Sequence, residues 1–167
     1  AQGLSADELE RKLFLVRRIA QNRILEQKLD KEEQFYVCSL SCRTIVYKGL
    51  MLAPKIGAYY PDLLDTDTQT ALAIVHQRFS TNTFPTWDLA HPFRYIAHNG
   101  EINTLRGNRN WMRAREQGLK SEAFGDDLPK LFPLVNKSGS DSATLDNAVE
   151  LLTLGGRSLA HVMLLLI

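Results

Sequence analysis

The chain has 167 residues, 44% of them hydrophobic, and its 20 Lys and Arg against 19 Asp and Glu leave a formal charge of +1. This length is enough for one globular domain with a sizeable core. The near-neutral charge gives no global field that would favour nucleic acid or an anionic membrane as a partner. No apolar run reaches the roughly 18 residues that a membrane-spanning helix needs.

The first part of the chain predicts an amphipathic helix followed by strand-forming sequence. Ser5 and Glu8 form a capping box, and the apolar residues behind them recur at helical spacing. This pattern predicts a helix from about residue 6 to about residue 22. After a charged connector, the segment 35–51 is rich in Val, Ile, Tyr and Phe, so it predicts a strand pair or one bent strand.

The middle of the chain alternates turn signals with apolar runs. Pro and Gly punctuate the segment 52–65, which predicts a short helix with turns. The run 71–79 is apolar enough for a buried strand, and 94–99 is a second candidate strand. Between them, the segment 80–93 contains two prolines and predicts a loop.

The remaining sequence predicts helices. Residues 104–117 have helical spacing and end before a glycine. Ser140 or Ser142 caps a further helix that ends at Gly155, and Ser158 starts an apolar helix that continues to the last residue. Strands in the first half and middle, followed by helices, predict a layered α+β domain.

The two ends of the sequence predict a piece of a longer chain. Residue 1 is Ala, and the last nine residues, LAHVMLLLI, stop within an apolar run rather than at a polar cap. Such a run has to be buried against something that follows or surrounds it. We therefore expect residues 1–167 to be the internal part of one domain, truncated at both ends.

The pair Asn99-Gly100 permits two interpretations. Asn-Gly is a strong signal for a tight hairpin turn. However, the residues that follow lead into the predicted 104–117 helix instead of alternating as a returning strand would. This order places the Asn99 amide and the Gly100 N–H near one another, where both can face one negatively charged oxygen. The pattern alone leaves a plain turn and an oxyanion site both open.

Two charged residues suit the two ends of an α-amino acid. Arg78 lies where an apolar run gives way to a polar loop, and a planar guanidinium there can bind a carboxylate through two hydrogen bonds. Asp141 lies beside a helix N-cap and can accept hydrogen bonds from an ammonium group. The alternatives are a surface ion pair for Arg78 and helix capping for Asp141.

Three stretches of the sequence carry a resemblance to a known family. They are CRTIVYKGLM, HQRFSTNTFPTWDLAHPFRYIAHNGEINTLRGNRNWM and SGSDSATLDNAVELLTLGGRS, of which HNGEINT and SDSATLDN are the most telling. Over essentially its whole length the chain resembles the class II glutamine amidotransferases, and among them the glutaminase domain of the glutamate synthase large chain. The resemblance implies an N-terminal-nucleophile fold, a four-layer αββα sandwich that is incomplete in this chain. It also implies hydrolysis of L-glutamine to glutamate and ammonia through a thioester.

The resemblance further assigns roles to individual residues. It implies that Arg78 binds the α-carboxylate of glutamine and that Asp141 binds its α-ammonium group. Asn99 and Gly100 match the pair of residues that form the oxyanion site. Thr81 belongs to the same motifs and is expected among the substrate-binding residues.

The nucleophile of this family is a cysteine at the mature N-terminus, whose own α-amino group, with a pKa near ~8, accepts the proton. Residue 1 here is Ala. Neither Cys38 nor Cys42 can replace that cysteine, because the nitrogen of an internal cysteine is tied up in a peptide bond. The resemblance therefore predicts no nucleophile in this chain and no glutaminase turnover by the isolated chain.

The same resemblance implies cofactors for the parent enzyme but none for this chain. The parent is expected to use FMN and an iron–sulfur cluster to join the ammonia to 2-oxoglutarate. The expected partners are L-glutamine and the remaining domains of the parent, with neither nucleic acid nor membrane. If Cys38 and Cys42 lie on one strand, about 13 Å separates them, beyond the ~7 Å limit for a disulfide. Free thiols favour a cytoplasmic location, or a plastid if the parent depends on ferredoxin.

Three other interpretations compete with this one. Four arginines of the 104–117 helix could form a basic binding module, but their spacing spreads them around the helix; they are Arg106, Arg109, Arg113 and Arg115. The four histidines are His76, His91, His98 and His161, at intervals of 15, 7 and 63 residues. These intervals fit no compact metal-ligand spacing, so we expect individual histidines and no metal. The third alternative is a structural fragment that folds only against absent segments.

Overall fold

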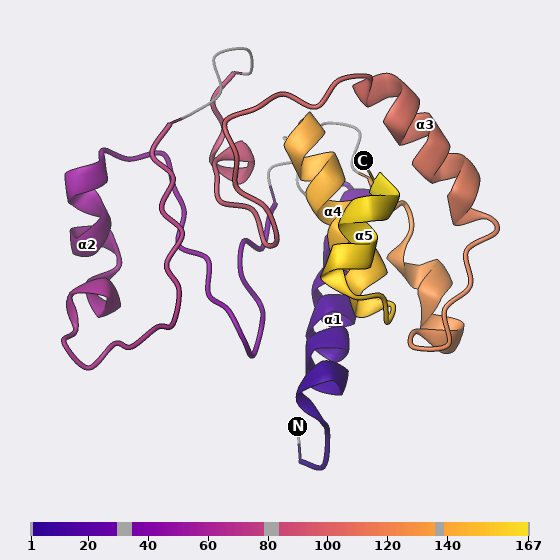
Figure 1. Cartoon of the computed structure of the whole chain (residues 1–167), viewed down its shortest axis with the longest axis horizontal. Coiled ribbons are helices and arrows are strands. Elements are labelled where there is room, and N and C mark those ends of the chain that lie inside the picture. The colour runs from indigo at the N-terminus through magenta and orange to yellow at the C-terminus, as the bar shows by residue number, and fades with distance from the viewer. Residues whose placement is uncertain (1, 30–34, 79–83, 136–138, 167) are drawn as a thin grey trace.

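The computed structural model describes residues 2–29, 35–78, 84–135 and 139–166. The α-helices in these ranges are α1 (Ala6–Glu26), α2 (Ile56–Tyr59), α3 (Leu105–Glu116), α4 (Asp141–Leu154) and α5 (Leu159–Leu166) (Figure 1). The 3₁₀ helices are η1 (Ala53–Lys55), η2 (Pro61–Leu64), η3 (Trp87–Leu89) and η4 (Gly125–Leu131). No β-strand is assigned within the four described ranges.

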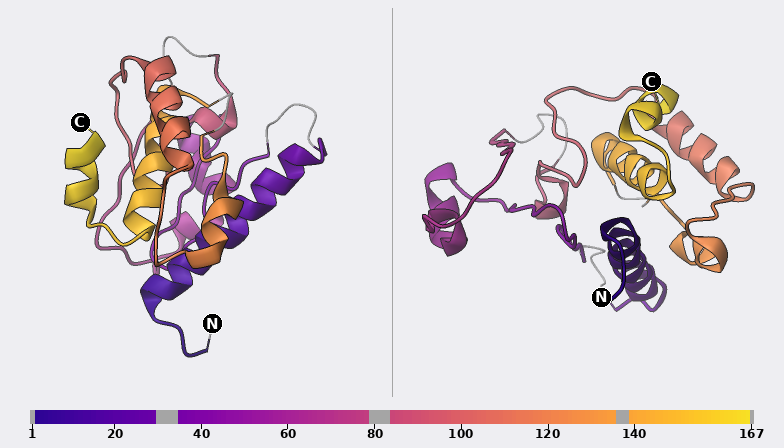
Figure 2. Two further views of the ribbon diagram at one scale, coloured as in Figure 1. Left: turned by 90° about the vertical axis from the view of Figure 1, so that its right-hand side faces the viewer. Right: turned by 60° about the horizontal axis from the view of Figure 1, so that its bottom comes forward.

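The longer helices gather on one side of the molecule, and α2 with the extended chain on either side of it lies on the other (Figure 1). The right-hand view of Figure 2 shows the same division. α1 packs against η4 and α4, and α4 packs against α5. The hydrophobic core lies on this helical side and is formed by Phe14, Met112, Phe124, Leu128, Leu131, Leu134, Val135, Ala148, Leu151 and Leu154.

The helices follow the caps and the spacing of the sequence. Ser5 and Glu8 form the predicted capping box, and α1 extends about one turn beyond its predicted end. Ser140 caps α4 by accepting a hydrogen bond from the Ala143 N–H at 3.1 Å. The three helices predicted in the second half of the chain are confirmed, as is the short helix with turns over 52–65.

The strand predictions are wrong for the described residues. The sequence predicts strands in the segments 35–51, 71–79 and 94–99. Residue 79 lies outside the described ranges, and no strand is assigned in the rest of these segments. The second of these segments is not buried either, since Leu72 is 75% exposed and Val75 is 88% exposed. An apolar run forms a strand only where a neighbouring strand completes its backbone hydrogen bonds. No ladder of such bonds is assigned within the described ranges, so these ranges are helices and irregular chain, and the predicted α+β layering is not confirmed.

Two buried polar side chains of α1 hold the stretch 130–134 against this helix. Arg18 is 3% exposed, and its guanidinium donates to the carbonyls of Leu131, Pro133 and Leu134. Asn22 donates to two further carbonyls of the same stretch, at 3.3 and 3.2 Å. Burial lowers the pKa of Arg18 to about 10, so the guanidinium remains charged at neutral pH. These bonds satisfy backbone carbonyls at the end of η4 and in the irregular chain that follows it.

Candidate active site

Asp146 of α4 holds the backbone that leads into the Asn-Gly turn. Its side chain is almost fully buried, with the residue 1% exposed. Oδ1 accepts hydrogen bonds from the N–H groups of Tyr95 at 2.7 Å and Ile96 at 3.2 Å, and Oδ2 accepts one from Arg94 at 3.3 Å. Burial, reinforced by the neighbouring Glu150 carboxylate, raises the pKa of Asp146, while the N–H groups of Tyr95 and Arg94 and the Arg94 guanidinium oppose the rise. One carboxylate thus satisfies three successive backbone donors.

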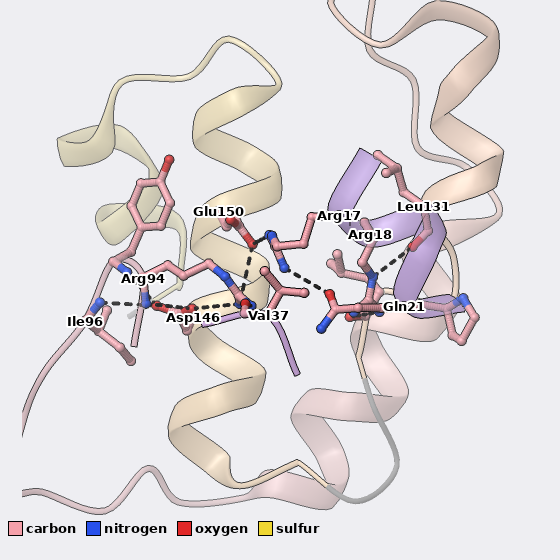
Figure 3. A network of polar contacts seen from close by, with 12 residues as sticks. Arg17, Arg18, Gln21, Val37, Arg94, Ile96, Leu131, Asp146 and Glu150 are labelled. Carbon is pink, nitrogen blue, oxygen red and sulfur yellow. Dashed lines mark hydrogen bonds and ion pairs between the residues drawn. The ribbon is translucent and has the colours of Figure 1, made fainter. Parts of the chain in front are cut away.

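A buried ionic network surrounds this carboxylate (Figure 3). The Arg94 Nη1 atom lies 3.9 Å from both Asp146 Oδ2 and Glu150 Oε2. Arg17 Nη2 lies 2.5 Å from Glu150 Oε2, and Arg94 Nη2 donates to the Val37 carbonyl at 2.5 Å. The network therefore joins α1, α4, the stretch 94–96 and the chain at Val37. Removing one member of such a buried network leaves the others desolvated and unpaired, which is costly.

Asp141, the first residue of α4, binds the chain directly after the turn. Its Oδ2 accepts a hydrogen bond from the Ile102 N–H at 2.7 Å, and its Oδ1 accepts one from the Ser142 N–H at 2.7 Å. Burial on its own would raise the pKa of Asp141, but the hydrogen bonds from Ile102 and Ser142 outweigh it, and the pKa lies below its usual value. The carboxylate is therefore ionised at neutral pH. It retains lone pairs that can accept from a ligand, because two carboxylate oxygens offer about four acceptor sites.

The third contact of α4 with the turn is made by Ser142. The Ser142 Oγ lies 2.8 Å from His98 Nε2, and the His98 Nδ1 accepts a hydrogen bond from the Gly100 N–H at 3.0 Å. Because Nδ1 accepts a hydrogen bond, this pattern places a ring proton of His98 on Nε2, which donates to Ser142. We call Asp141, Ser142 and Asp146 the α4 clamp, since together they hold the segment 94–102 before, at and after the turn.

The side chain of Asn99 is held by His76, which lies outside α4. Its Oδ1 lies 2.8 Å from His76 Nε2, and the same nitrogen lies 3.2 Å from the His98 carbonyl oxygen. Asn99 and Gly100 are both exposed. The amide nitrogen of Asn99 and the Gly100 N–H are the two donors that sequence reasoning assigned to an oxyanion site.

Three histidines that are distant in sequence come together beside the turn. The ring centroids of His76 and His91 are 4.7 Å apart, and those of His91 and His98 are 5.3 Å apart. Burial, reinforced by the two neighbouring rings, lowers the pKa of His91 to about 4, so its ring is neutral at physiological pH. The prediction of individual histidines is wrong for these three, whereas His161 lies apart on α5 and is exposed. No group of His, Cys, Asp and Glu in the described part of the chain is arranged to hold a metal ion.

The two remaining predicted substrate-binding residues lie at or beyond the edge of a described range. Arg78 is exposed and follows His76 by two residues, so its backbone lies close to the chain that contacts Asn99. None of the ion pairs among the described residues involves Arg78. Thr81 lies outside the described residues.

The arginines of α3 do not form one basic face. Arg109 is half-buried and donates to the Gly139 carbonyl, directly before α4. Arg106, Arg113 and Arg115 are exposed. Arg109 therefore serves the packing of α3 near the start of α4, which removes one member from the proposed binding module.

Both cysteines are free thiols, as predicted, and neither contacts the turn. The Cys42 N–H donates to Glu10 of α1 at 2.5 Å, and its thiol lies 3.8 Å from the Ala6 carbonyl. The interaction of the Cys42 thiol with the Glu10 side chain raises the pKa of Cys42 and so disfavours its thiolate. The Cys38 thiol lies 3.7 Å from the Val46 carbonyl. Neither environment is that of an activated nucleophile.

The contacts that sequence reasoning missed have large separations along the chain. Asp146 bonds residues that precede it by 50 to 52 positions, and His76 bonds one that follows it by 23 positions. A helix pattern explains why Asp146 lies on α4 but not which backbone it meets. The only sign in the sequence that Asp146 has a buried partner is that this charged residue lies close to core positions such as Ala148 and Leu151.

Comparison with known proteins identifies the family of the chain. The family model of the class-II glutamine amidotransferases matches residues 1–167. The chain is 56% identical to the glutamate synthase [NADPH] large chain of Bacillus subtilis over 99% of its length, and 49% identical to the ferredoxin-dependent glutamate synthase of Pyropia yezoensis over 100%. It is 53% identical to the glutamate synthase [NADH] of Saccharomyces cerevisiae over 86%. The chain belongs to the class-II glutamine amidotransferases.

The matched region is a small part of each relative. The chain covers 11% of the Bacillus and Pyropia proteins and 6% of the yeast protein. Among the described residues, no helix has the length and apolar character needed to cross a membrane.

Proposed function

We propose that this chain is the glutamine-hydrolysing part of a glutamate synthase, in which L-glutamine is split into glutamate and ammonia. The family match over residues 1–167 supports the amidotransferase chemistry, and the names of the relatives support the parent enzyme. Because the chain covers 11% of the Bacillus relative, the remaining domains of the parent are its proposed partners.

One observation carries the assignment of the site. The Asp141 carboxylate is bonded to the Ile102 N–H at 2.7 Å, so the predicted ammonium-binding group and the Asn99-Gly100 turn form one unit. In the proposed complex Asp141 accepts from the α-ammonium group of glutamine, and Arg78 and Thr81 bind the α-carboxylate end. Opposite charges at the two ends match an α-amino acid.

The turn supplies the oxyanion donors in this proposal. A thiolate attacks the side-chain carbonyl carbon of glutamine, a C–S bond forms, and the carbonyl oxygen becomes negative. The Asn99 amide and the Gly100 N–H donate to that oxygen, which takes the place of His98 Nδ1 as the acceptor for Gly100. Collapse of the intermediate breaks the C–N bond, the α-amino group that took the proton of the thiol gives it to the leaving nitrogen, and ammonia departs. Water then hydrolyses the thioester to glutamate and restores the thiol.

The nucleophile is proposed to lie in a part of the parent outside this sequence. The contacts of Cys38 and Cys42 support this, because both thiols bond to backbone carbonyls away from the turn and Glu10 raises the pKa of Cys42. A well-placed oxyanion donor is worth about 3 kcal/mol of transition-state stabilisation, yet it has nothing to stabilise without a thiolate.

The complete domain is proposed to be the four-layer αββα sandwich of the N-terminal-nucleophile fold, with residues 1–167 as an internal part. Exposed apolar side chains of the 71–78 segment support this proposal: Leu72 is 75%, Ile74 62% and Val75 88% exposed. Exposed apolar runs of this kind mark surfaces that another part of a protein covers. Strands supplied by the rest of the domain would cover these residues and complete their hydrogen bonds.

FMN and an iron–sulfur cluster belong to other domains of the parent in this proposal. An iron–sulfur cluster is held by several cysteine thiolates, and this sequence has only two cysteines. The proposed location is that of the parent enzyme. This is the cytoplasm, or a plastid if the electron donor is ferredoxin.

Ammonia release tests the function directly. We expect a full-length enzyme that contains this sequence to release ammonia and glutamate from L-glutamine in equal amounts. The 167-residue chain alone is expected to release none above a heat-denatured blank. Coupled measurement of both products with each protein is the assay. Failure of the full-length enzyme to hydrolyse glutamine would refute the function, whereas turnover by the 167-residue chain would refute only the external nucleophile.

A further inference from the structure

The orientation of the Asn99 side chain decides whether it can act as an oxyanion donor. Rotation of the terminal amide by 180° exchanges its oxygen and nitrogen, and the torsion that sets this orientation has broad preferences. An exposed asparagine would therefore present its oxygen to the substrate for part of the time, and an oxygen there repels the developing negative charge. Something has to fix the amide with its nitrogen towards the substrate.

The contact between His76 and Asn99 has the required polarity. Around His76 Nε2 lie two oxygens, the Asn99 Oδ1 at 2.8 Å and the His98 carbonyl at 3.2 Å. A carbonyl oxygen only accepts hydrogen bonds, so His76 Nε2 carries the proton and donates. The amide oxygen of Asn99 is then fixed towards His76, and its NH₂ group is directed elsewhere.

We propose that His76 is a positioning residue that orients the Asn99 amide for oxyanion binding. This inference rests on the oxyanion role proposed for Asn99. His76 does not touch the reacting atoms in this scheme and acts only through Asn99.

The surroundings of His76 support one fixed tautomer. Its Nδ1 is buried and has no hydrogen-bond partner among the described residues, which suits an unprotonated nitrogen better than a buried N–H donor. The ring packs against His91 with centroids 4.7 Å apart, and His91 also packs against Phe93 at 4.7 Å. These rings restrict the motion of His76 and keep its Nε2 directed at Asn99.

A double-mutant cycle in the full-length enzyme tests this inference. We expect His76→Ala to lower kcat for glutamine hydrolysis about 10- to 100-fold with little change in KM, because the amide loses its orientation while the substrate-binding groups remain. His76→Gln should recover most of kcat, since its side-chain NH₂ can replace Nε2–H as the donor. In an Asn99→Ala background, His76→Ala should lower kcat less than twofold further. His161→Ala, at an exposed position of α5, is the control and should keep kcat unchanged.

The outcomes separate the two proposals. If Asn99→Ala lowers kcat but His76→Ala lowers it by the same factor in both backgrounds, the positioning role of His76 is wrong and the oxyanion role of Asn99 stands. A rise in KM alone, or no recovery with His76→Gln, also overturns the inference. If Asn99→Ala leaves kcat unchanged, the oxyanion assignment fails, and the positioning role fails with it.

Discussion

Replacing Asn99 with alanine in a full-length enzyme that contains this sequence is expected to lower kcat for glutamine hydrolysis by about 10²- to 10³-fold. The lost amide donates only to the oxygen that becomes negative in the transition state, so KM should change little. The Gly100 N–H remains in the variant, which leaves a residual rate. Steady-state ammonia release over a range of glutamine concentrations measures both constants.

An asparagine outside the turn provides the matched control for this prediction. Asn110 is exposed on α3, and Asn110→Ala should leave kcat and KM unchanged. If Asn99→Ala instead raised KM and left kcat intact, Asn99 would bind the ground state of the substrate. The oxyanion assignment of the turn would then be wrong.

Replacing Asp146 with alanine is expected to destabilise the 167-residue chain by about 3–5 kcal/mol. The substitution leaves the N–H groups of Arg94, Tyr95 and Ile96 without their shared acceptor and removes a carboxylate from the buried network around Arg94. Urea unfolding followed by circular dichroism measures the loss. Hydrogen exchange should locate it, with the amides of residues 94–96 losing protection first.

The control for this prediction is an aspartate of η4. Asp126 is exposed, so Asp126→Ala should shift the unfolding midpoint by no more than an ordinary surface substitution. Equal midpoints for Asp146→Ala and Asp126→Ala would show that the buried contacts of Asp146 do not stabilise the fold. Unchanged protection of the 94–96 amides would show that they are held by other groups.

The helices could be predicted because their signals are local. The capping box of Ser5 with Glu8 and the cap at Ser140 are contained within four residues each, and both are present. The strand predictions failed for the opposite reason. An apolar run such as 71–78 indicates that its side chains are to be buried. It does not contain the neighbouring strand that would bury them and pair with the backbone.

The site was predictable in part. The roles given to Asn99, Gly100 and Asp141 came from the resemblance of their motifs, and those roles remain proposals. That Asp141 bonds to Ile102 across 39 positions is a property of the folded chain and could not be read from the sequence. The α4 clamp and the three histidines depend in the same way on packing between distant segments.

The most direct measurement is a crystal structure of the full-length enzyme with L-glutamate bound. We predict the α-ammonium group within hydrogen-bonding distance of Asp141, the α-carboxylate on Arg78, and a side-chain carboxylate oxygen facing Asn99 Nδ2 and the Gly100 N–H. Glutamate bound away from Asp141, or with its side chain directed away from the turn, would contradict the assignment of this site.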